Sequence, residues 1–480
     1  MENSDKSKVD KSIDKNGKNI GIISRPNASP GYWLSCLVPL AFLVTNNRMQ
    51  TCSKEDDNLF LIFTIVSMGM LMQSLAFFAC LAVAPGRYLK LFFALMPGTL
   101  THFQLQYWTQ QTYGVCLALG FGATLGYQYV YVRVLRGFPK SCTLGEACIL
   151  VQGVVLFLIN GFFRIPMFYK SPPIEEFGKV SAIMTGALFC LLVVSWLLAT
   201  FKVFRSLILF YLSMILLVLA VCVMPVTKVL PIITVFQFIY SDLRRVYIVI
   251  FYMTMTIATI LAVKWQMGNS EQASTRVRKI FHVLIVLVYI PGLIFQCTFL
   301  YLATGVALAV FSVLDMIRML KIPPLASVLE DAFATLHDEK DAGNIALTPF
   351  CLLIGCSLPL WINPCPCSET DSASGVNLIA MLAGILSVGI GDTAASVFGS
   401  KFGKHKWSES NRSIEGSLAF VLSQSIIIVP LYLFNLAPVD GLSVISTLSA
   451  IVITAGVEAL TDQIDNLVLP LVFYIVVNIR

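Results

Sequence analysis

The sequence is poor in charged residues, which make up only 12% of its 480 positions, whereas an ordinary soluble domain has about 25%. Hydrophobic residues make up 57%, against roughly 45–50% in soluble proteins. One water-soluble core cannot account for that excess, so an ordinary soluble domain is excluded. The net charge of +6 is modest. In a membrane protein such an excess of Lys and Arg mainly sets orientation, so it does not indicate nucleic-acid binding.

The sequence also lacks a cysteine framework and a signal peptide. The thirteen cysteines are scattered without paired CxxC motifs or metal-ligand spacing, and most are expected to be small packing residues. Cys365 and Cys367 are too close in sequence for a favourable mutual bridge. No apolar stretch precedes Trp33, so a cleavable signal peptide is not expected. Residues 1–31 are predicted to be a disordered, polar N-terminal tail.

Long apolar runs are what the sequence has instead. A helix needs about 20 apolar residues to cross a bilayer, and runs near this length recur throughout the chain. Two shorter runs, 33–44 and 229–240, are doubtful. The predicted fold is therefore an all-α, polytopic transmembrane helix bundle of about 13–15 spans. The clear runs are 59–84, 113–134, 144–165, 180–200, 206–224, 246–264, 280–303, 305–320, 345–361, 376–397, 416–436, 442–457 and 467–479.

Mixed charge is concentrated in the last part of the chain. Residues 32–270 have short loops with isolated basic residues and are predicted to be a transmembrane scaffold, whereas residues 271–480 are predicted to be the catalytic region. Two spans separate each charged cluster from the next, so all the clusters share one face. The positive-inside rule makes that face cytoplasmic. Basic clusters could serve only to fix topology, but acidic residues contribute little to orientation and need another explanation. The clusters lie at 276–282, 315–341, 392–415 and 458–465.

The segment from Gly389 to Glu415 is predicted to be a polar, basic loop. Its glycines would let backbone N–H groups approach an anion, and its lysines add positive charge, as in a phosphate cradle. Asp392 could hold a divalent cation that bridges phosphate oxygens. The segment lacks the strand context of a dinucleotide fingerprint and the spacing of a Walker A loop. Alternatively, the glycines could merely permit close packing of helices.

A second candidate cluster is Glu458, Asp462 and Asp465. Spacings of four and three residues would place the three carboxylates on one helical face. Ionisable groups at the end of an apolar span are candidates for function, and the alternative is a solvated helix end.

Two further pairs have the spacing of neighbours on a helix. Arg278 and His282 are four residues apart, and Asp315 and Arg318 are three apart, so each pair could meet. Because it follows basic residues, His282 is a candidate for contacting a phosphate or a proton.

These motifs together resemble the dolichol kinase family. The resemblance rests on GIGDTAASVFG at 389–399, SIEG at 413–416 and TDQIDN at 461–466, with RKIFH at 278–282 in support. It is convincing from about residue 276 to the C-terminus, whereas upstream the likeness is only one of hydropathy. Members are endoplasmic-reticulum membrane enzymes that use CTP to phosphorylate dolichol, which yields the dolichyl phosphate used in protein glycosylation.

The resemblance implies a multi-pass protein of the endoplasmic reticulum with its active site facing the cytoplasm. CTP would be the phosphate donor, dolichol in the bilayer the acceptor, and Mg²⁺ or a similar divalent cation the cofactor. Asp392 is assigned to the metal, without excluding Asp462 or Asp465. The catalytic candidates are Glu458, Asp462, Asp465 and His282. The residues assigned to CTP are Gly391, Thr393, Ser396, Gly399, Lys401, Gly403, Lys404, Lys406, Arg412 and Glu415.

Three alternatives are open at this point. The chain could be a CTP-dependent kinase of diacylglycerol or phytol, or a cytidylyltransferase acting on a lipid phosphate, although the latter family's Lys-Asp and His-Gly-Gly signature is absent. It could also be a transporter. Transporters tend to have broken helices near the midplane in both halves, whereas here the polar residues lie at one surface of one half.

Overall fold

The computed structural model describes residues 13–48, 54–269, 275–336, 343, 345, 347–363, 366–367, 371, 378–408, 410–437 and 440–479. The regular secondary structure in these ranges is helical, and their one β-type pairing is an isolated antiparallel bridge between Lys406 and Ser413. The predicted all-α polytopic bundle is confirmed.

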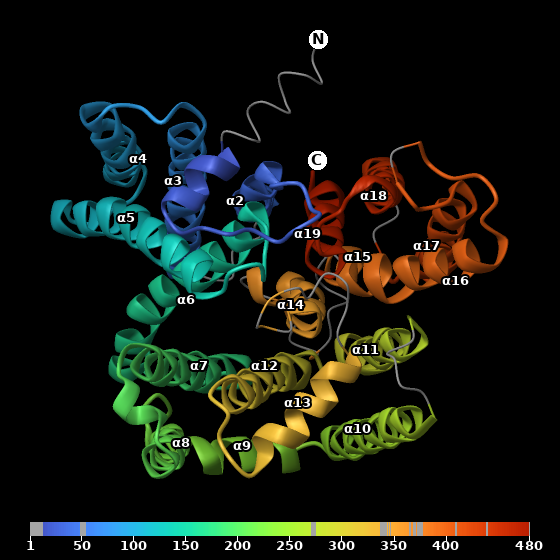
Figure 1. Cartoon of the computed structure of the whole chain (residues 1–480). Coiled ribbons are helices and arrows are strands. Elements are labelled where there is room, and N and C mark those ends of the chain that lie inside the picture. The colour runs from blue at the N-terminus through green and yellow to red at the C-terminus, as the bar shows by residue number, and fades with distance from the viewer. Residues whose placement is uncertain are drawn as a thin grey trace.

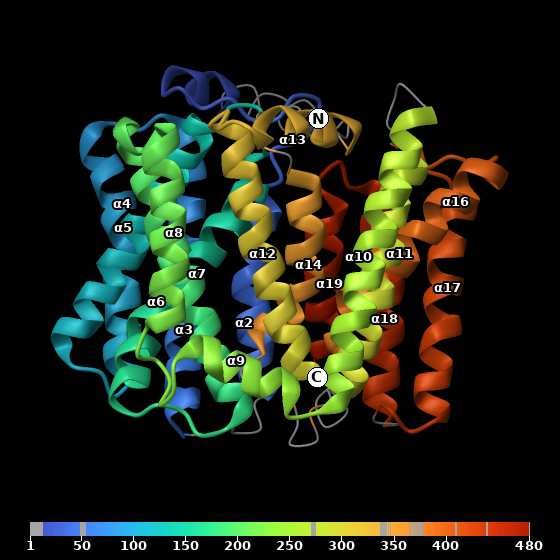
Figure 2. The same cartoon turned by 90° about the horizontal axis from the view of Figure 1, so that it is seen from below.

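Eight helices are long and apolar enough to cross a membrane, and five shorter apolar helices accompany them within the described ranges. Together they number thirteen among the described residues, at the lower end of the 13–15 spans predicted. Helix α4 (Arg87–Trp108) was not among the predicted runs because Pro97 and polar residues such as His102 interrupt its hydropathy. The doubtful run 229–240 forms α9 (Pro231–Tyr240), which lies across the end of the bundle instead of along it (Figure 2).

In the first part of the bundle the helices run roughly antiparallel to one another, and the N-terminal segment lies over one end of them (Figure 1 and Figure 2). Its remaining elements are η1 (Tyr32–Cys36), α2 (Leu37–Arg48), α3 (Lys54–Val83), α5 (Tyr113–Gly137), α6 (Leu144–Lys170), α7 (Glu176–Thr200), η2 (Lys202–Arg205), α8 (Leu207–Val223) and α10 (Leu243–Asn269).

The second part carries the candidate site. Nearly every residue of α19 (Asp465–Asn478) is buried, which makes it a central, rigid helix. The other elements are α11 (Thr275–Phe295), α12 (Cys297–Met319), α13 (Leu325–Leu336), α14 (Leu347–Ile362), α15 (Leu378–Met381), a π-helix η4 (Ile385–Asp392), α16 (Thr393–Phe402), α17 (Ile414–Leu433) and α18 (Gly441–Leu460).

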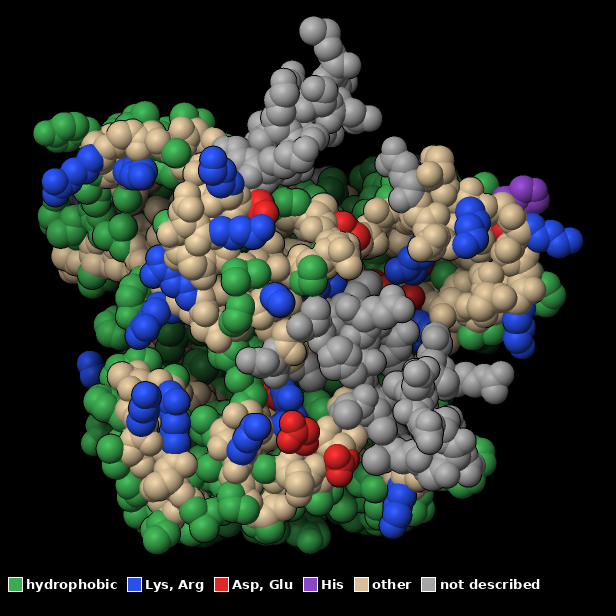
Figure 3. Space-filling model, in the orientation of Figure 1, with side chains coloured by type: hydrophobic (Ala, Val, Ile, Leu, Met, Phe, Trp, Pro, Cys, Tyr) green, Lys and Arg blue, Asp and Glu red, His purple; other side chains and the backbone are tan. Residues whose placement is uncertain are grey.

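The two ends of the bundle differ in chemistry. Helices α13 and α16 lie at one end, and α9 lies at the other (Figure 2). The face with α13 and α16 carries many Lys and Arg side chains and few Asp and Glu (Figure 3). This agrees with the prediction that the charged clusters share one face.

At the opposite end Cys297 forms a disulfide with Cys367 across a sequence separation of 70 residues. The expectation of no cysteine framework was therefore wrong for this pair, because only the fold brings the start of α12 beside Cys367. Cys365 lies outside the described residues.

Residues 13–31 of the predicted disordered tail are described and pack against the bundle, so disorder was wrong for this part. Residues 13–19 are helical, and Ile13, Ile22 and Arg25 are buried against the bundle. Residues 1–12 lie outside the described part of the chain.

Candidate active site

Asp392 lies at the end of the π-helix η4, buried between neighbouring helices. A π-helix is rare and frequently marks a functional position. A Cβ added at Gly389 would lie 2.6 Å from Val286 Cγ2, and one added at Gly391 would lie 2.7 Å from Gln424 Nε2. These two glycines therefore permit close helix packing, the alternative weighed for the sequence. The segment 389–402 is helical and not a loop, and the loop is limited to 403–413.

The glycines after Asp392 bring α16 against the start of α17. A Cβ at Gly399 would lie 3.0 Å from Ser413 Oγ, and one at Gly416 would lie 3.0 Å from Ala395 O. A Cβ at Gly403 would be closer still to Ser413 Oγ, at 2.6 Å. Small residues at these positions thus hold the loop 403–413 close to Asp392.

Two basic groups from α11 face the Asp392 carboxylate. Lys279 Nζ lies 2.7 Å from Asp392 Oδ2, and His282 Nε2 lies 3.5 Å from the same oxygen. His282 Nε2 is also 3.3 Å from Asn466 Oδ1. The spacing of three residues places Lys279 beside His282. The side chain of Arg278, the partner expected from sequence, lies outside the described side chains.

Arg412 joins the remaining carboxylates. Its guanidinium binds Glu458 through Nη1 and Asp465 Oδ2 through Nη2 at 3.2 Å. Nη1 is also 4.0 Å from Asp392 Oδ1. One arginine therefore lies among three carboxylates that come from different helices.

The structure does not place Asp462 with Glu458 and Asp465. Helix α18 ends at Leu460 and α19 begins at Asp465, so the three carboxylates do not share one helical face and that prediction was wrong. Asp462 instead accepts hydrogen bonds from Ser29 N at 2.5 Å and Ser29 Oγ at 2.8 Å. Burial raises the pKa of Asp462, but these bonds and one from Gln463 outweigh it and hold the pKa below the ordinary value.

The turn that precedes Asp465 is held by a buried clasp. Glu146 Oε1 accepts hydrogen bonds from Arg25 Nη2 and from Ile464 N, both at 2.7 Å. Arg25 and Glu146 are 4% and 0% exposed, so this is a buried ion pair. Thr143 Oγ1 completes the clasp by donating to Gln463 Oε1 at 2.6 Å. Residues of the predicted scaffold and tail thus fix the position of Asp465.

The residues assigned to CTP lie around the loop 403–413 in different environments. Ser396, Gly399, Gly403, Lys406 and Arg412 line the cavity described below, whereas Lys401 and Lys404 are exposed and are not among its lining residues.

Two other assigned residues have local structural surroundings. Glu415 accepts from His405 N at 3.2 Å and lies 2.7 Å from His405 Nδ1, so it shapes the loop. The Thr393 hydroxyl is buried and has no hydrogen-bond partner among the described residues.

Asp315 and Arg318 meet as their spacing predicted. Arg318 Nη2 lies 2.6 Å from Asp315 Oδ1, and the guanidinium stands over the Phe333 ring, 4.9 Å from its centroid. This cation–π contact attaches α13 to the end of α12. The Asp338–Asp341 cluster lies outside the described residues.

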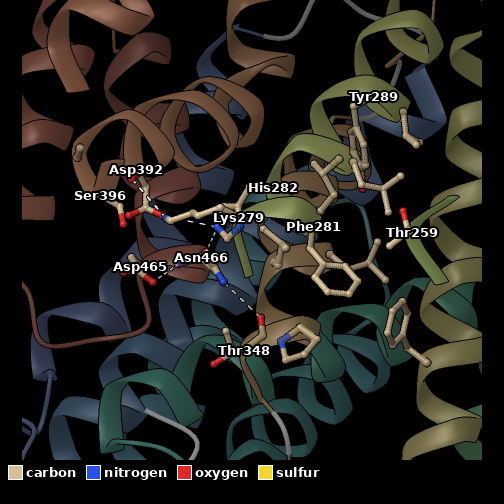
Figure 4. A pocket seen from close by; sticks show the side chains of 18 of the residues that line it. Thr259, Lys279, Phe281, His282, Tyr289, Thr348, Asp392, Ser396, Asp465 and Asn466 are labelled. Atoms are coloured by element: carbon tan, nitrogen blue, oxygen red, sulfur yellow. Dashed lines mark hydrogen bonds and ion pairs between the residues drawn. The ribbon is translucent and has the colours of Figure 1, made fainter. Parts of the chain in front are cut away.

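These elements enclose a cavity of about 1160 Å³. One end is charged and polar, with Lys279, His282, Asp392 and Asp465 grouped together, while Phe281 and Tyr289 lie away from this group (Figure 4). The cavity crosses the boundary predicted at residue 270, because Tyr252 of α10 lines it too.

Several lining residues were not in the predicted site: Lys279, Thr348, Asn411 and Asn466. For Lys279 the signal was available, since it lies three residues before His282. Thr348 and Asn411 carry no distinguishing pattern in one sequence.

The fold and the cavity define the class of protein: a membrane-embedded protein in which a cavity between described helices joins a charged end to an apolar chamber. Residues 25–352 match a family model described as dolichol kinase. The match extends far upstream of residue 276, where the sequence by itself indicated only a likeness of hydropathy.

Curated relatives agree with the family model. The chain is 33% identical to the dolichol kinase of Bos taurus over 365 residues, which cover 73% of this chain and 67% of the relative. It is 33% identical to that of Homo sapiens over 359 residues, 72% and 66% of the two chains. Dolichol kinase EVAN of Arabidopsis thaliana is 34% identical over 251 residues, 51% and 42% of the two chains. No solved structure matches the chain.

The chain belongs to the dolichol kinase family. Its match spans about two thirds of the length of the mammalian relatives. Membership identifies a multi-pass membrane kinase of a lipid alcohol, and it does not favour a cytidylyltransferase or a kinase of diacylglycerol or phytol.

Proposed function

We propose that this protein transfers the γ-phosphate of CTP to the terminal hydroxyl of dolichol at the cytoplasmic face of the endoplasmic-reticulum membrane. One observation carries the proposal: a single cavity has Lys279, Lys406 and Arg412 at its charged end and an apolar chamber at the other. A nucleotide belongs in water and a polyprenyl tail in hydrocarbon, so the two can react only where such environments meet.

The charged end suits phosphoryl transfer, which needs mainly positioning and neutralisation of charge. Lys406 and Arg412 would contact the phosphates, while Lys279 and His282 lie toward the apolar chamber. The hydroxyl oxygen bonds to the γ-phosphorus, the bond between the β- and γ-phosphates breaks, and CDP leaves. The hydroxyl proton passes to a group beside it, for which His282 is placed.

A divalent cation fits this site only with help from the substrate. Among the described residues no three His, Cys, Asp or Glu side chains are grouped to hold a metal. Mg²⁺, however, is usually held by one or two carboxylates together with substrate phosphates and water. Asp392 and Asp465 both face the Arg412 guanidinium. These two carboxylates would hold the divalent cation, and the cation would neutralise charge on the phosphates.

The orientation is supported by two independent features. Lys and Arg gather on the face with the charged end of the cavity, as expected for a cytoplasmic face (Figure 3). The Cys297–Cys367 disulfide lies at the other end of α11, and disulfides persist in oxidising compartments such as the lumen of the endoplasmic reticulum.

The test is Asp392→Asn in membranes supplied with dolichol, labelled CTP and Mg²⁺. The variant lacks one carboxylate that would hold the divalent cation, and the cation is proposed to neutralise charge on the reacting phosphates. Turnover should therefore fall by on the order of 100-fold. Asp331→Asn, at an exposed position on α13, is the matched control and should keep full turnover. Full turnover of the Asp392 variant at normal protein level would contradict the assignment.

A further inference from the structure

The apolar chamber reaches deep into the bundle. Along α12 its lining runs from Leu314 to Leu300, which at about 1.5 Å per residue is roughly 20 Å. The hydrocarbon core of a bilayer is about 30 Å thick. The chamber is therefore long enough for the end of a polyprenyl chain but cannot enclose a chain much longer than the bilayer is thick.

The chamber is open at the side. Ile260 of α10 and Val310 of α12 both line it and are 60% and 50% exposed. Only 11% of the α10 span is buried inside the bundle, so this helix forms the outer edge of the chamber and its lining side chains lie at the rim. Helices α10 and α12 lie on the same side of the bundle (Figure 2). Because both helices are candidate spans, the opening faces lipid.

The chamber is lined on its other sides by buried or half-buried side chains. Phe281 and Ile285 of α11 and Leu352 of α14 form the inner walls, and Phe333 of α13, over which Arg318 lies, covers part of the end at the charged face. The end with α13 carries the charged groups, so an apolar lipid tail is expected to leave the chamber sideways into the bilayer.

We infer that the acceptor enters through this lateral opening between α10 and α12, with only its hydroxyl end inside the chamber and the rest of its tail in the bilayer. This inference rests on the proposed function and identifies the route and the binding site of the polyprenyl tail. The tail beyond the rim touches no protein wall, so acceptors of different length share one site. Ile260 and Val310 are the residues that contact the tail where it crosses the rim.

The test compares two variants of the same helix. Val310→Trp places a large ring at the rim. Val306→Trp, one turn away, is the matched control because Val306 is 49% exposed but does not line the chamber. Each variant is assayed in membranes with a long dolichol and with a three-isoprene, α-saturated prenol that is short enough to fit inside.

Val310→Trp should raise KM for the long dolichol by about tenfold, which corresponds to the loss of contacts equal to about two buried methylene groups. For the same variant, KM for the short prenol should stay within about twofold of the wild-type value. For Val306→Trp, KM for the long dolichol and KM for the short prenol should both stay within about twofold of wild type. The same pair of results is expected for Ile260→Trp against Leu261→Trp, since both positions are 60% exposed and only Ile260 lines the chamber.

Two outcomes would overturn the inference: equal KM values for Val310→Trp and Val306→Trp with long dolichol, or an equal rise for short and long acceptors. If the wild-type protein phosphorylates neither acceptor, the proposed function itself fails, which is a different result from either of these.

Discussion

Removal of Arg412 should separate the structural and chemical roles of the charged cluster. Glu458 has a side chain that is 2% exposed, and Arg412 is its ion-pair partner. In Arg412→Met the buried Glu458 carboxylate loses its cation. Removing one partner of a buried ion pair lowers the free energy of unfolding by about 3–5 kcal/mol. We expect a loss of about 3 kcal/mol here, at the lower end of that range, because the Arg412 side chain is 29% exposed.

The double variant Arg412→Met/Glu458→Gln removes the unpaired charge and should recover most of the lost stability. It should not recover activity, because Arg412 also faces Asp392 and lines the cavity where the phosphates are proposed to bind. We expect turnover on the order of 100-fold below wild type in both variants. Thermal unfolding in detergent and transfer from labelled CTP measure the two effects, with Arg133→Met as the control for an exposed arginine. A single variant as stable as wild type, or a double variant with normal turnover, would refute the reasoning.

Three further predictions concern the surroundings of the site. Glu146→Gln leaves Arg25 buried without its counter-charge and should lower stability by about 3–5 kcal/mol, seen as earlier thermal unfolding; an unchanged unfolding curve would contradict the clasp. Asp462→Asn should keep the rate of phosphate transfer within about tenfold of wild type, because the carboxylate contacts the N-terminal segment and does not line the cavity. A larger loss of rate in a steady-state assay with dolichol would contradict this. Peptide mapping without reductant should find Cys297 linked to Cys367, whereas free thiols labelled from the cytoplasmic side would argue against the orientation.

The part of the site that could be predicted depends on helix ends and on counting spans. Asp392, Glu458, Asp465 and His282 all lie where an apolar run meets a charged cluster, and an even number of spans between clusters places them on one face. The structure brings these four residues together around Arg412 and Lys279.

What could not be predicted depends on interactions between distant parts of the sequence. The break between α18 and α19 contains no Pro or Gly, so the sequence predicts one continuous helix through Asp462. The hydrogen-bond partner that holds Asp462 elsewhere is Ser29, 433 residues away in the sequence. The disulfide of Cys297 likewise depends on the packing of loops. The glycines of 389–403 read equally well as a phosphate loop or as packing sites, and only the positions of neighbouring helices decide between the two.

The most direct test of the central claim is to supply membranes that contain the protein with dolichol and CTP labelled in either the γ- or the α-phosphate. A kinase moves only the γ-phosphate, so we predict labelled dolichyl phosphate from γ-labelled CTP and none from α-labelled CTP. Label in lipid from α-labelled CTP, or label in added diacylglycerol in place of dolichol, would contradict the account.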